Sequence, residues 1–113
     1  MTETKFRVSD ADEIFLHNDN GLCRLTFYDD NKSVCFLSTL VIDEWRRQCG
    51  HANEMLQFAD NIAKREGCTH ITLQVDSKSW KRAWYKRRGY KEVAEGYESG
   101  KILMTKKLKE DQE

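Results

Sequence analysis

Hydrophobic and polar residues follow a strand-like pattern in the first half of the chain. Apolar stretches run over residues 13–17, 22–28 and 34–42, and short polar turns separate them. The first turn contains Asn-Gly at 20–21, a strong hairpin signal. The stretch 34–42 is the longest apolar run, so we expect a central strand buried on both faces. Residues 9–12 fit either the cap of a short helix or the approach to the first strand.

Helical and strand-like periods alternate in the second half. Apolar residues recur every three to four positions from Ala52 to Ala63, as on one face of an amphipathic helix, and Gly67 follows as a helix end. Alternation from Ile71 to Val75 is typical of a strand. The expected elements are helices over 52–63 and 80–88 and strands over 71–75, 90–94 and 101–108.

The resulting order of elements is β-β-β-α-β-α-β-β. A helix between two apolar strands implies a crossover between parallel strands, whereas the early hairpins are antiparallel. We therefore expect a mixed sheet with helices on its faces. A chain of 113 residues has the size of one domain, so residues 1–113 should form a single domain.

Composition excludes several classes of protein. Five Phe, four Tyr and three Trp argue against disorder, and the absence of proline argues against a collagen-like or proline-rich chain. No apolar run approaches the ~18 residues of a membrane span, and the first residues lack the apolar stretch of a signal peptide. We expect a cytoplasmic protein.

The cysteines and histidines do not show the spacing of a metal site. No CxxC occurs, and no histidine pairs with a cysteine at the spacing of a zinc site, so we expect no bound metal. Without a signal peptide, reduced thiols that fill core or loop positions are expected. The four cysteines are Cys23, Cys35, Cys49 and Cys68.

The turn at 47–52 joins the most apolar strand to the first helix, where a phosphate group can bind. The first N–H groups of a helix have no partner within the helix, and the helix dipole attracts an anion there. Gly50 permits close backbone approach, Ala52 keeps the first turn small, and Arg47 adds a positive charge. A plain strand-to-helix turn that contains a glycine explains the same residues.

This turn resembles the Arg/Gln-x-x-Gly-x-Gly/Ala motif of the GNAT superfamily of N-acetyltransferases, with Arg47, Gly50 and Ala52 at its fixed places. The residues 40–44, Leu-Val-Ile-Asp-Glu, match the strand and acidic turn that precede the motif in that family. Further along, Trp-Tyr-Lys-Arg-Arg-Gly-Tyr at 84–90 resembles the family's aromatic-Tyr-x-x-x-Gly-aromatic pattern. The resemblance covers roughly residues 13–108.

The resemblance implies an α/β (α+β) fold with a mixed, mostly antiparallel central sheet flanked by helices. It also implies transfer of an acetyl group from acetyl-CoA, the cosubstrate, to a primary amine. By position, Tyr85 is the acid that protonates the thiolate, and Glu44 is a candidate base beside Asp43, His17 and water. The cofactor-binding positions implied are Leu40, Val41, Ile42, Arg47, Gln48, Cys49, Gly50, His51, Ala52 and Asn53.

Departures from the family pattern concern the acceptor. Cys49 and His51 replace residues that are often glycine or small, and Ser77-Lys78 stands where an Asn often precedes the second helix. The family's N-terminal strand and two helices are largely missing, because only about twelve residues precede Glu13. An open acceptor site is therefore expected, or a homodimer that completes it. A catalytically inactive GNAT-fold module that binds CoA or a protein is an alternative.

The distribution of charge bears on the ligands. The net charge is zero, but residues 1–44 carry four basic and nine acidic side chains, net −5, and residues 45–113 carry fifteen and ten, net +5. The acidic half suits a cationic amine. The basic segment 78–91 fits a solvated helix face, a site for the 3′-phosphate of CoA, or a nucleic-acid contact. Zero net charge makes nucleic acid the least favoured of the three.

Overall fold

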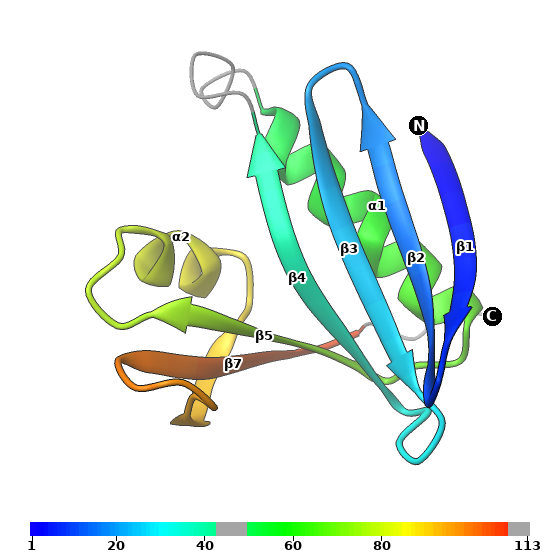
Figure 1. Cartoon of the computed structure of the whole chain (residues 1–113). Coiled ribbons are helices and arrows are strands. Elements are labelled where there is room, and N and C mark those ends of the chain that lie inside the picture. The colour runs from blue at the N-terminus through cyan, green and yellow to red at the C-terminus, as the bar shows by residue number, and fades with distance from the viewer. Residues whose placement is uncertain (43–49, 109–113) are drawn as a thin grey trace, which may run out of the picture.

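The structure is a computed structural model that describes residues 1–42 and 50–108 (Figure 1). In these residues one sheet of seven strands has the order β1-β2-β3-β4-β5-β7-β6, and two helices cover it. The elements are β1 (Thr2–Val8), β2 (Ala11–Asn18), β3 (Gly21–Tyr28), β4 (Val34–Ile42), α1 (His51–Arg65), β5 (His70–Asp76), α2 (Lys81–Arg87), β6 (Lys91–Glu95) and β7 (Lys101–Lys107).

The first four strands form an antiparallel meander. The turn between β2 and β3 is the one that the Asn-Gly pair predicts. The side-chain Oδ1 of Asn18 accepts hydrogen bonds from the N–H groups of Asn20, at 2.8 Å, and Gly21, at 3.1 Å. This Asx turn fixes the register of the hairpin, which places Ile14 opposite Leu25 on the same face.

Helix α1 connects the parallel strands β4 and β5, as the sequence predicts. The chain then passes through α2 to β6 at the far edge and returns in β7, which pairs antiparallel with both β5 and β6. Both helical crossovers progress across the sheet in the same direction. Because such crossovers are right-handed, both helices lie on one face of the sheet.

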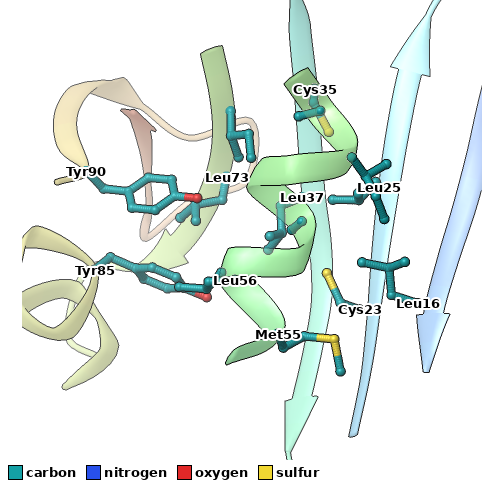
Figure 2. Packing of buried hydrophobic residues seen from close by; sticks show 14 of the residues in the cluster. Leu16, Cys23, Leu25, Cys35, Leu37, Met55, Leu56, Leu73, Tyr85 and Tyr90 are labelled. Carbon is teal, nitrogen blue, oxygen red and sulfur yellow. The ribbon is translucent and has the colours of Figure 1, made fainter. Parts of the chain in front are cut away.

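One core cluster fills the space between the helices and the sheet. Leu16, Leu25, Leu37 and Leu73 project from the strands and are almost fully buried. Figure 2 shows Leu56 of α1 and Tyr85 of α2 on the same side of the strands as these residues. Apolar positions at helical spacing put Met55, Leu56, Ala59, Ile62 and Ala63 on the buried face of α1.

The described cysteines are part of this core. Cys23, Cys35 and Cys68 are free and buried. Burial raises the pKa of all three thiols, that of Cys23 to about 12, so these thiols stay protonated at neutral pH. This agrees with the interpretation of the cysteines as small core residues. Cys49 lies outside the described residues.

Two expectations about the strands are corrected. The expected order β-β-β-α-β-α-β-β lacks one strand, because an N-terminal strand that was expected to be largely missing is present as β1. Of the two possibilities left open for residues 9–12, the helix cap is wrong, since Ser9-Asp10 is the turn to β2. Strand β4 is not buried on both faces, since Cys35 and Leu37 are buried but the side chain of Val41 is 55% exposed. The reason is that both helices cover one face only. The fold class itself is confirmed.

Neither described helix is long and apolar enough to cross a membrane.

Candidate functional site

Strands β4 and β5 separate at the middle of the sheet. They pair in parallel only from Val34 to Leu37 on β4 and from His70 to Leu73 on β5. Beyond these residues β4 continues to Ile42 and β5 to Asp76 without pairing to each other. The peptide groups that face the gap therefore have no β4–β5 ladder partner, and a peptide N–H or C=O that leaves its ladder needs another partner, which a ligand can supply.

A β-bulge lies in β4 where the strands separate. Arg24 of β3 pairs with Ser38 and Leu22 pairs with Val41, so Thr39 and Leu40 together lie opposite one residue, Cys23. Thr39 has φ 57°, in the left-handed region that side chains rarely adopt. Bulges of this kind redirect peptide groups and are frequent beside active sites.

A cleft of about 270 Å³ fills the gap between the strands. Strands β4 and β5 supply its two walls, and α2 and β7 supply the rest. The lining residues are Leu37, Ser38, Thr39, Leu40, Leu73, Gln74, Val75, Asp76, Ser79, Lys81, Tyr85 and Lys101. The cleft thus combines apolar walls, one carboxylate, two lysines and a phenol.

Tyr85 lines the cleft from the last turns of α2. Its side chain is buried, and its ring meets the rings of Trp84 and Tyr90 edge to face, with centroids 5.1 and 5.3 Å away. Burial, with a smaller contribution from the Cys23 thiol, raises the pKa of Tyr85 to about 12. The phenol therefore holds its proton at neutral pH and is able to donate it.

The start of α1 offers a second polar site. Gly50 caps the helix with φ 80° and ψ 7°, and among the described residues no side-chain cap hydrogen bond forms at this end. A Cβ added to Gly50 would meet no heavy atom of the described residues within 4 Å, so these residues leave space in front of this turn. Free N–H groups, a positive helix end and open space are the features of a phosphate site.

Two contacts hold this turn in place. Nδ1 of His51 lies 3.1 Å from Nδ2 of Asn20, which ties the first residue of α1 to the β2–β3 turn. Oδ1 of Asn53 accepts a 2.6 Å hydrogen bond from Nε of Arg88. The Arg88 guanidinium also lies 3.8 Å from the centroid of the Trp84 ring. A cation from the end of α2 is thus fixed beside the first turn of α1.

The basic segment 78–91 is partly neutralised within the fold. Arg82 donates to Oε1 of Glu92 at 2.7 Å, and Nζ of Lys86 lies 2.6 Å from Oε2 of the same residue. These pairs hold the pKa of Glu92 below its usual value, Lys86 contributing most. Two of the seven basic side chains are therefore engaged with a carboxylate, which reduces the charge available to a nucleic acid.

The predicted site residues fall into four groups. Tyr85 and Leu40 line the cleft, and Gly50, His51, Ala52 and Asn53 form the start of α1. Val41 and Ile42 follow the bulge outside the cleft lining, Val41 with an exposed side chain and Ile42 with a buried one. Glu44, Arg47, Gln48 and Cys49 lie outside the described residues.

Of the twelve residues that line the cleft, the sequence predicted two, Leu40 and Tyr85; Ser38, Thr39, Asp76 and Lys101 are among the ten that it did not. Ser38 and Thr39 lie two positions and one position before Leu40, the first predicted strand contact, because the bulge shifts the opening toward the start of β4. Asp76 ends β5, and its place at the carboxyl end of a parallel strand is a signal that was available. Lys101 comes from β7, and only the β5–β7 register, which pairs it with Asp76, brings it to the cleft.

Metal ligands do not cluster in the described ranges. No group of three or more His, Cys, Asp or Glu side chains in residues 1–42 and 50–108 is arranged to hold a metal ion.

Comparison with known proteins gives a consistent result. A family model for the acetyltransferase (GNAT) domain matches residues 5–92. No curated protein matches the sequence. Among solved structures, an acetyltransferase from Bacillus cereus ATCC 14579 is similar, with 26% identity and a TM-score of 0.66, over 85% of this chain and 71% of that chain.

Two further structures share the fold. A GNAT family acetyltransferase from Elizabethkingia anophelis with acetyl-CoA bound has 14% identity and a TM-score of 0.69, over 88% of this chain and 77% of that chain. The PaiA N-acetyltransferase from Thermoplasma acidophilum in complex with coenzyme A has 20% identity and a TM-score of 0.71, over 87% of this chain and 61% of that chain. Since the family model spans most of a sequence that folds in this way, the chain belongs to the GNAT acetyltransferase family.

Proposed function

We propose that the protein is an N-acetyltransferase that transfers an acetyl group from acetyl-CoA to a primary amine on a small molecule or a protein. The observation that carries the proposal is the position of Tyr85. This protonated phenol lines the cleft between the separated strands, and the start of α1, where an anion can bind, follows the same strand β4 along the chain.

The residues present fit acetyl-CoA. The cosubstrate supplies an activated acetyl thioester and three phosphate groups. The free peptide groups of β4 around Thr39 and Leu40 suit its amide-containing arm, which can bind as an added strand would. The N–H groups of His51 and Ala52 and the open space before Gly50 suit its pyrophosphate. Arg47, Gln48 and Cys49 would complete this turn, as their places in the motif imply.

Tyr85 supports the reaction through its proton. When the carbon–sulfur bond breaks, the departing thiolate needs a proton, and an ordinary thiol has a pKa of about 8.5. The Tyr85 phenol is protonated at neutral pH, although burial, which raises its pKa to about 12, also makes it a weaker acid than an exposed tyrosine. Its support for the acid role is therefore its position in the cleft. Free peptide N–H groups at the bulge supply donors for the negative charge that develops on the carbonyl oxygen.

The acceptor amine must lose a proton before it attacks, so a base or a water molecule has to receive one. Glu44 remains the motif-based candidate. Asp76 is the carboxylate among the described residues of the cleft, and its Oδ1 accepts the backbone N–H of Lys78 at 2.9 Å. We propose that Asp76 holds the cationic amine at the cleft before transfer, because a carboxylate attracts an ammonium group.

The net charge of −5 on residues 1–44 overstates how strongly this half attracts a cationic acceptor over a long range. Arg7 bonds to both Asp12 and Asp29, and Arg24 lies 3.8 Å from Glu13. Several acidic side chains of the first half are therefore already paired with arginines of the same chain. Recognition of the amine then depends on the cleft itself rather than on the net charge of the strands around it.

Calorimetry with acetyl-CoA, followed by a thiol-release assay over a panel of polyamines, lysine derivatives and peptide N-termini, tests the proposal. We expect micromolar binding of acetyl-CoA and turnover with at least one cationic amine. Failure to bind at millimolar acetyl-CoA contradicts the enzyme assignment. Binding without turnover on any amine favours a catalytically inactive module instead.

A further inference from the structure

The face of the sheet opposite the helices is uncovered over β1–β4. Residues paired across neighbouring strands share a face, and the register assigns each side chain to one of them. The side chains opposite the core on these strands are those of Thr2, Thr4, Phe6, Val8, Ala11, Glu13, Phe15, His17, Leu22, Arg24, Thr26, Tyr28, Val34, Phe36, Ser38 and Val41. We call this surface the uncovered face.

Four aromatic side chains lie in two pairs on the uncovered face. Phe6 stacks on Phe15 with ring centroids 5.4 Å apart, and Tyr28 meets Phe36 edge to face at 5.6 Å. Phe6 is 38% exposed and Tyr28 37% exposed, although both belong to regular strands. The two aromatic pairs lie on either side of a polar group formed by Glu13, Arg24, Thr26 and Ser38. Partly exposed aromatic side chains on a sheet face of this kind are typical of a surface that another molecule covers.

The charges on the uncovered face are paired within the chain, and their arrangement also suits a second copy. Among its residues the charged ones are Glu13 and Arg24, which lie side by side with Nε and Oε2 3.8 Å apart. A two-fold axis in the interface, at right angles to the line between them, brings each Arg24 opposite the partner's Glu13. An isologous interface requires such self-complementary charge. A partner with a single sign of charge would leave one of the two groups facing a like charge.

The area of the uncovered face suits a reversible dimer. Four strands of seven to nine residues form it. With strands ~4.8 Å apart and ~3.3 Å per residue, the face measures about 500 Å², or about 1,000 Å² for two copies. This is the lower limit for a specific interface, so we expect association in the micromolar range or weaker.

We propose that two copies of this chain pack their uncovered faces together in a two-fold dimer. The dimer reaches the cleft, because Nε of Arg24 donates a 2.9 Å hydrogen bond to Oγ of Ser38, a cleft residue. The partner's surface then forms a wall of the cleft on the side away from the helices. The role of the partner's surface as a wall of the cleft rests on the proposed acetyltransferase function, whereas the dimer itself does not.

Sedimentation equilibrium of the whole chain from about 10 µM to 1 mM tests the dimer. The wild-type mass should rise from 13.3 kDa toward twice that value. Phe6→Lys should raise the dissociation constant at least about tenfold, since each interface loses two buried rings. Phe58→Lys is the matched control, because Phe58 is 37% exposed on α1, away from this face, and should not change the constant. Circular dichroism confirms that each variant is folded.

A charge exchange gives a second, independent readout. Arg24→Glu alone should weaken the dimer, because two acidic groups then face two others. Combining it with Glu13→Arg restores self-complementarity, so the double variant should form its own dimer. It should not form mixed dimers with the wild type, since Arg24 would then face the partner's arginine at position 13. Mixed and separate dimers are resolved by native mass spectrometry with one isotope-labelled chain.

Three results overturn the proposal: a wild-type mass that stays at 13.3 kDa at 1 mM, a dimer that Phe6→Lys leaves intact, or free mixing of the charge-exchanged and wild-type chains. The acetyltransferase assignment is tested separately by acetyl-CoA binding. If acetyl-CoA binds and the chain is monomeric, the dimer is wrong and the function stands. If the dimer forms and acetyl-CoA does not bind, the proposed function is wrong and the dimer stands.

Discussion

The ring of Tyr85 meets the ring of Tyr90 edge to face, with centroids 5.3 Å apart and planes inclined by 68°. Tyr85 lines the cleft between β4 and β5, whereas Tyr90 is buried outside the lining. The two phenols are thus neighbours with different access to a ligand in the cleft. Their comparison separates a chemical role of the Tyr85 hydroxyl from a packing role of its ring.

Replacing Tyr85 by Phe keeps the aromatic packing and removes the proton donor. We expect kcat to fall by about 10²–10⁴-fold, the usual contribution of a general acid, with little change in the dissociation constant of acetyl-CoA. Tyr90→Phe is the matched control and should retain wild-type turnover. Steady-state kinetics and calorimetry measure both effects. Equal activity of Tyr85→Phe and the wild type would refute the acid role.

Replacing Gly50 by Glu should abolish binding of acetyl-CoA. The substitution places a carboxylate where the pyrophosphate is expected and forces a side chain into a left-handed conformation, which costs about 1–2 kcal/mol of stability. Gly67→Glu is the control, since Gly67 has φ 87° and open space but lies at the other end of α1. Both variants should lose similar stability in urea. The phosphate site lies elsewhere if both bind acetyl-CoA equally well.

Replacing Asp76 by Asn should raise KM for the amine by about tenfold and leave KM for acetyl-CoA unchanged. The amide oxygen can still accept the N–H of Lys78, so the turn after β5 is kept while the charge is lost. Asp30→Asn makes the same change of charge on an exposed turn outside the cleft. An identical rise in KM for both variants would mean that the overall charge of the protein, and not a contact between Asp76 and the amine, affects amine binding.

The protein should lose stability as the pH rises above about 9. Burial raises the pKa of Cys23 from 9.0 and that of Tyr85 from 10.0, both to about 12. Between these values the unfolded chain has released protons that the folded chain still holds, so the free energy of unfolding falls with pH. Each group contributes about 1.4 kcal/mol per pH unit in its window, and its contribution is complete below its unfolded pKa.

Urea denaturation at pH 8, 9, 10 and 11 measures this slope. Cys23→Ala removes one of the groups, so its stability should fall less steeply between pH 9 and 11 than that of the wild type. An unchanged slope in the variant would mean that the Cys23 thiol does not hold its proton in the folded state.

Much of the fold follows from periodicity in the sequence, but β1 does not. Thr2, Thr4, Phe6 and Val8 alternate with polar residues as a strand requires, yet no side chain of β1 is buried. An edge strand without buried residues lacks the apolar signal that marked the other strands. The two-residue turn Ser9-Asp10 is equally short of distinctive residues.

The candidate site also has a part that the sequence predicts and a part that it does not. Gly50 and Tyr85 were predicted because each belongs to a local motif with a fixed spacing. No local sequence motif indicates the opening between β4 and β5, because the opening arises where the β4–β5 pairing stops after Leu37 and Leu73. Lys101 reaches the cleft through pairing between distant strands, and nothing near it in the sequence indicates this.

The central claim is that acetyl-CoA binds along β4 and at the start of α1. Titration of the ¹⁵N-labelled protein with acetyl-CoA, followed by amide chemical shifts, tests it most directly. We expect the largest shifts at Ser38, Thr39 and Leu40 and at Gly50, His51 and Ala52, with saturation in the micromolar range and little change in β1. Unchanged shifts at millimolar acetyl-CoA, or shifts confined to other strands, would contradict the account.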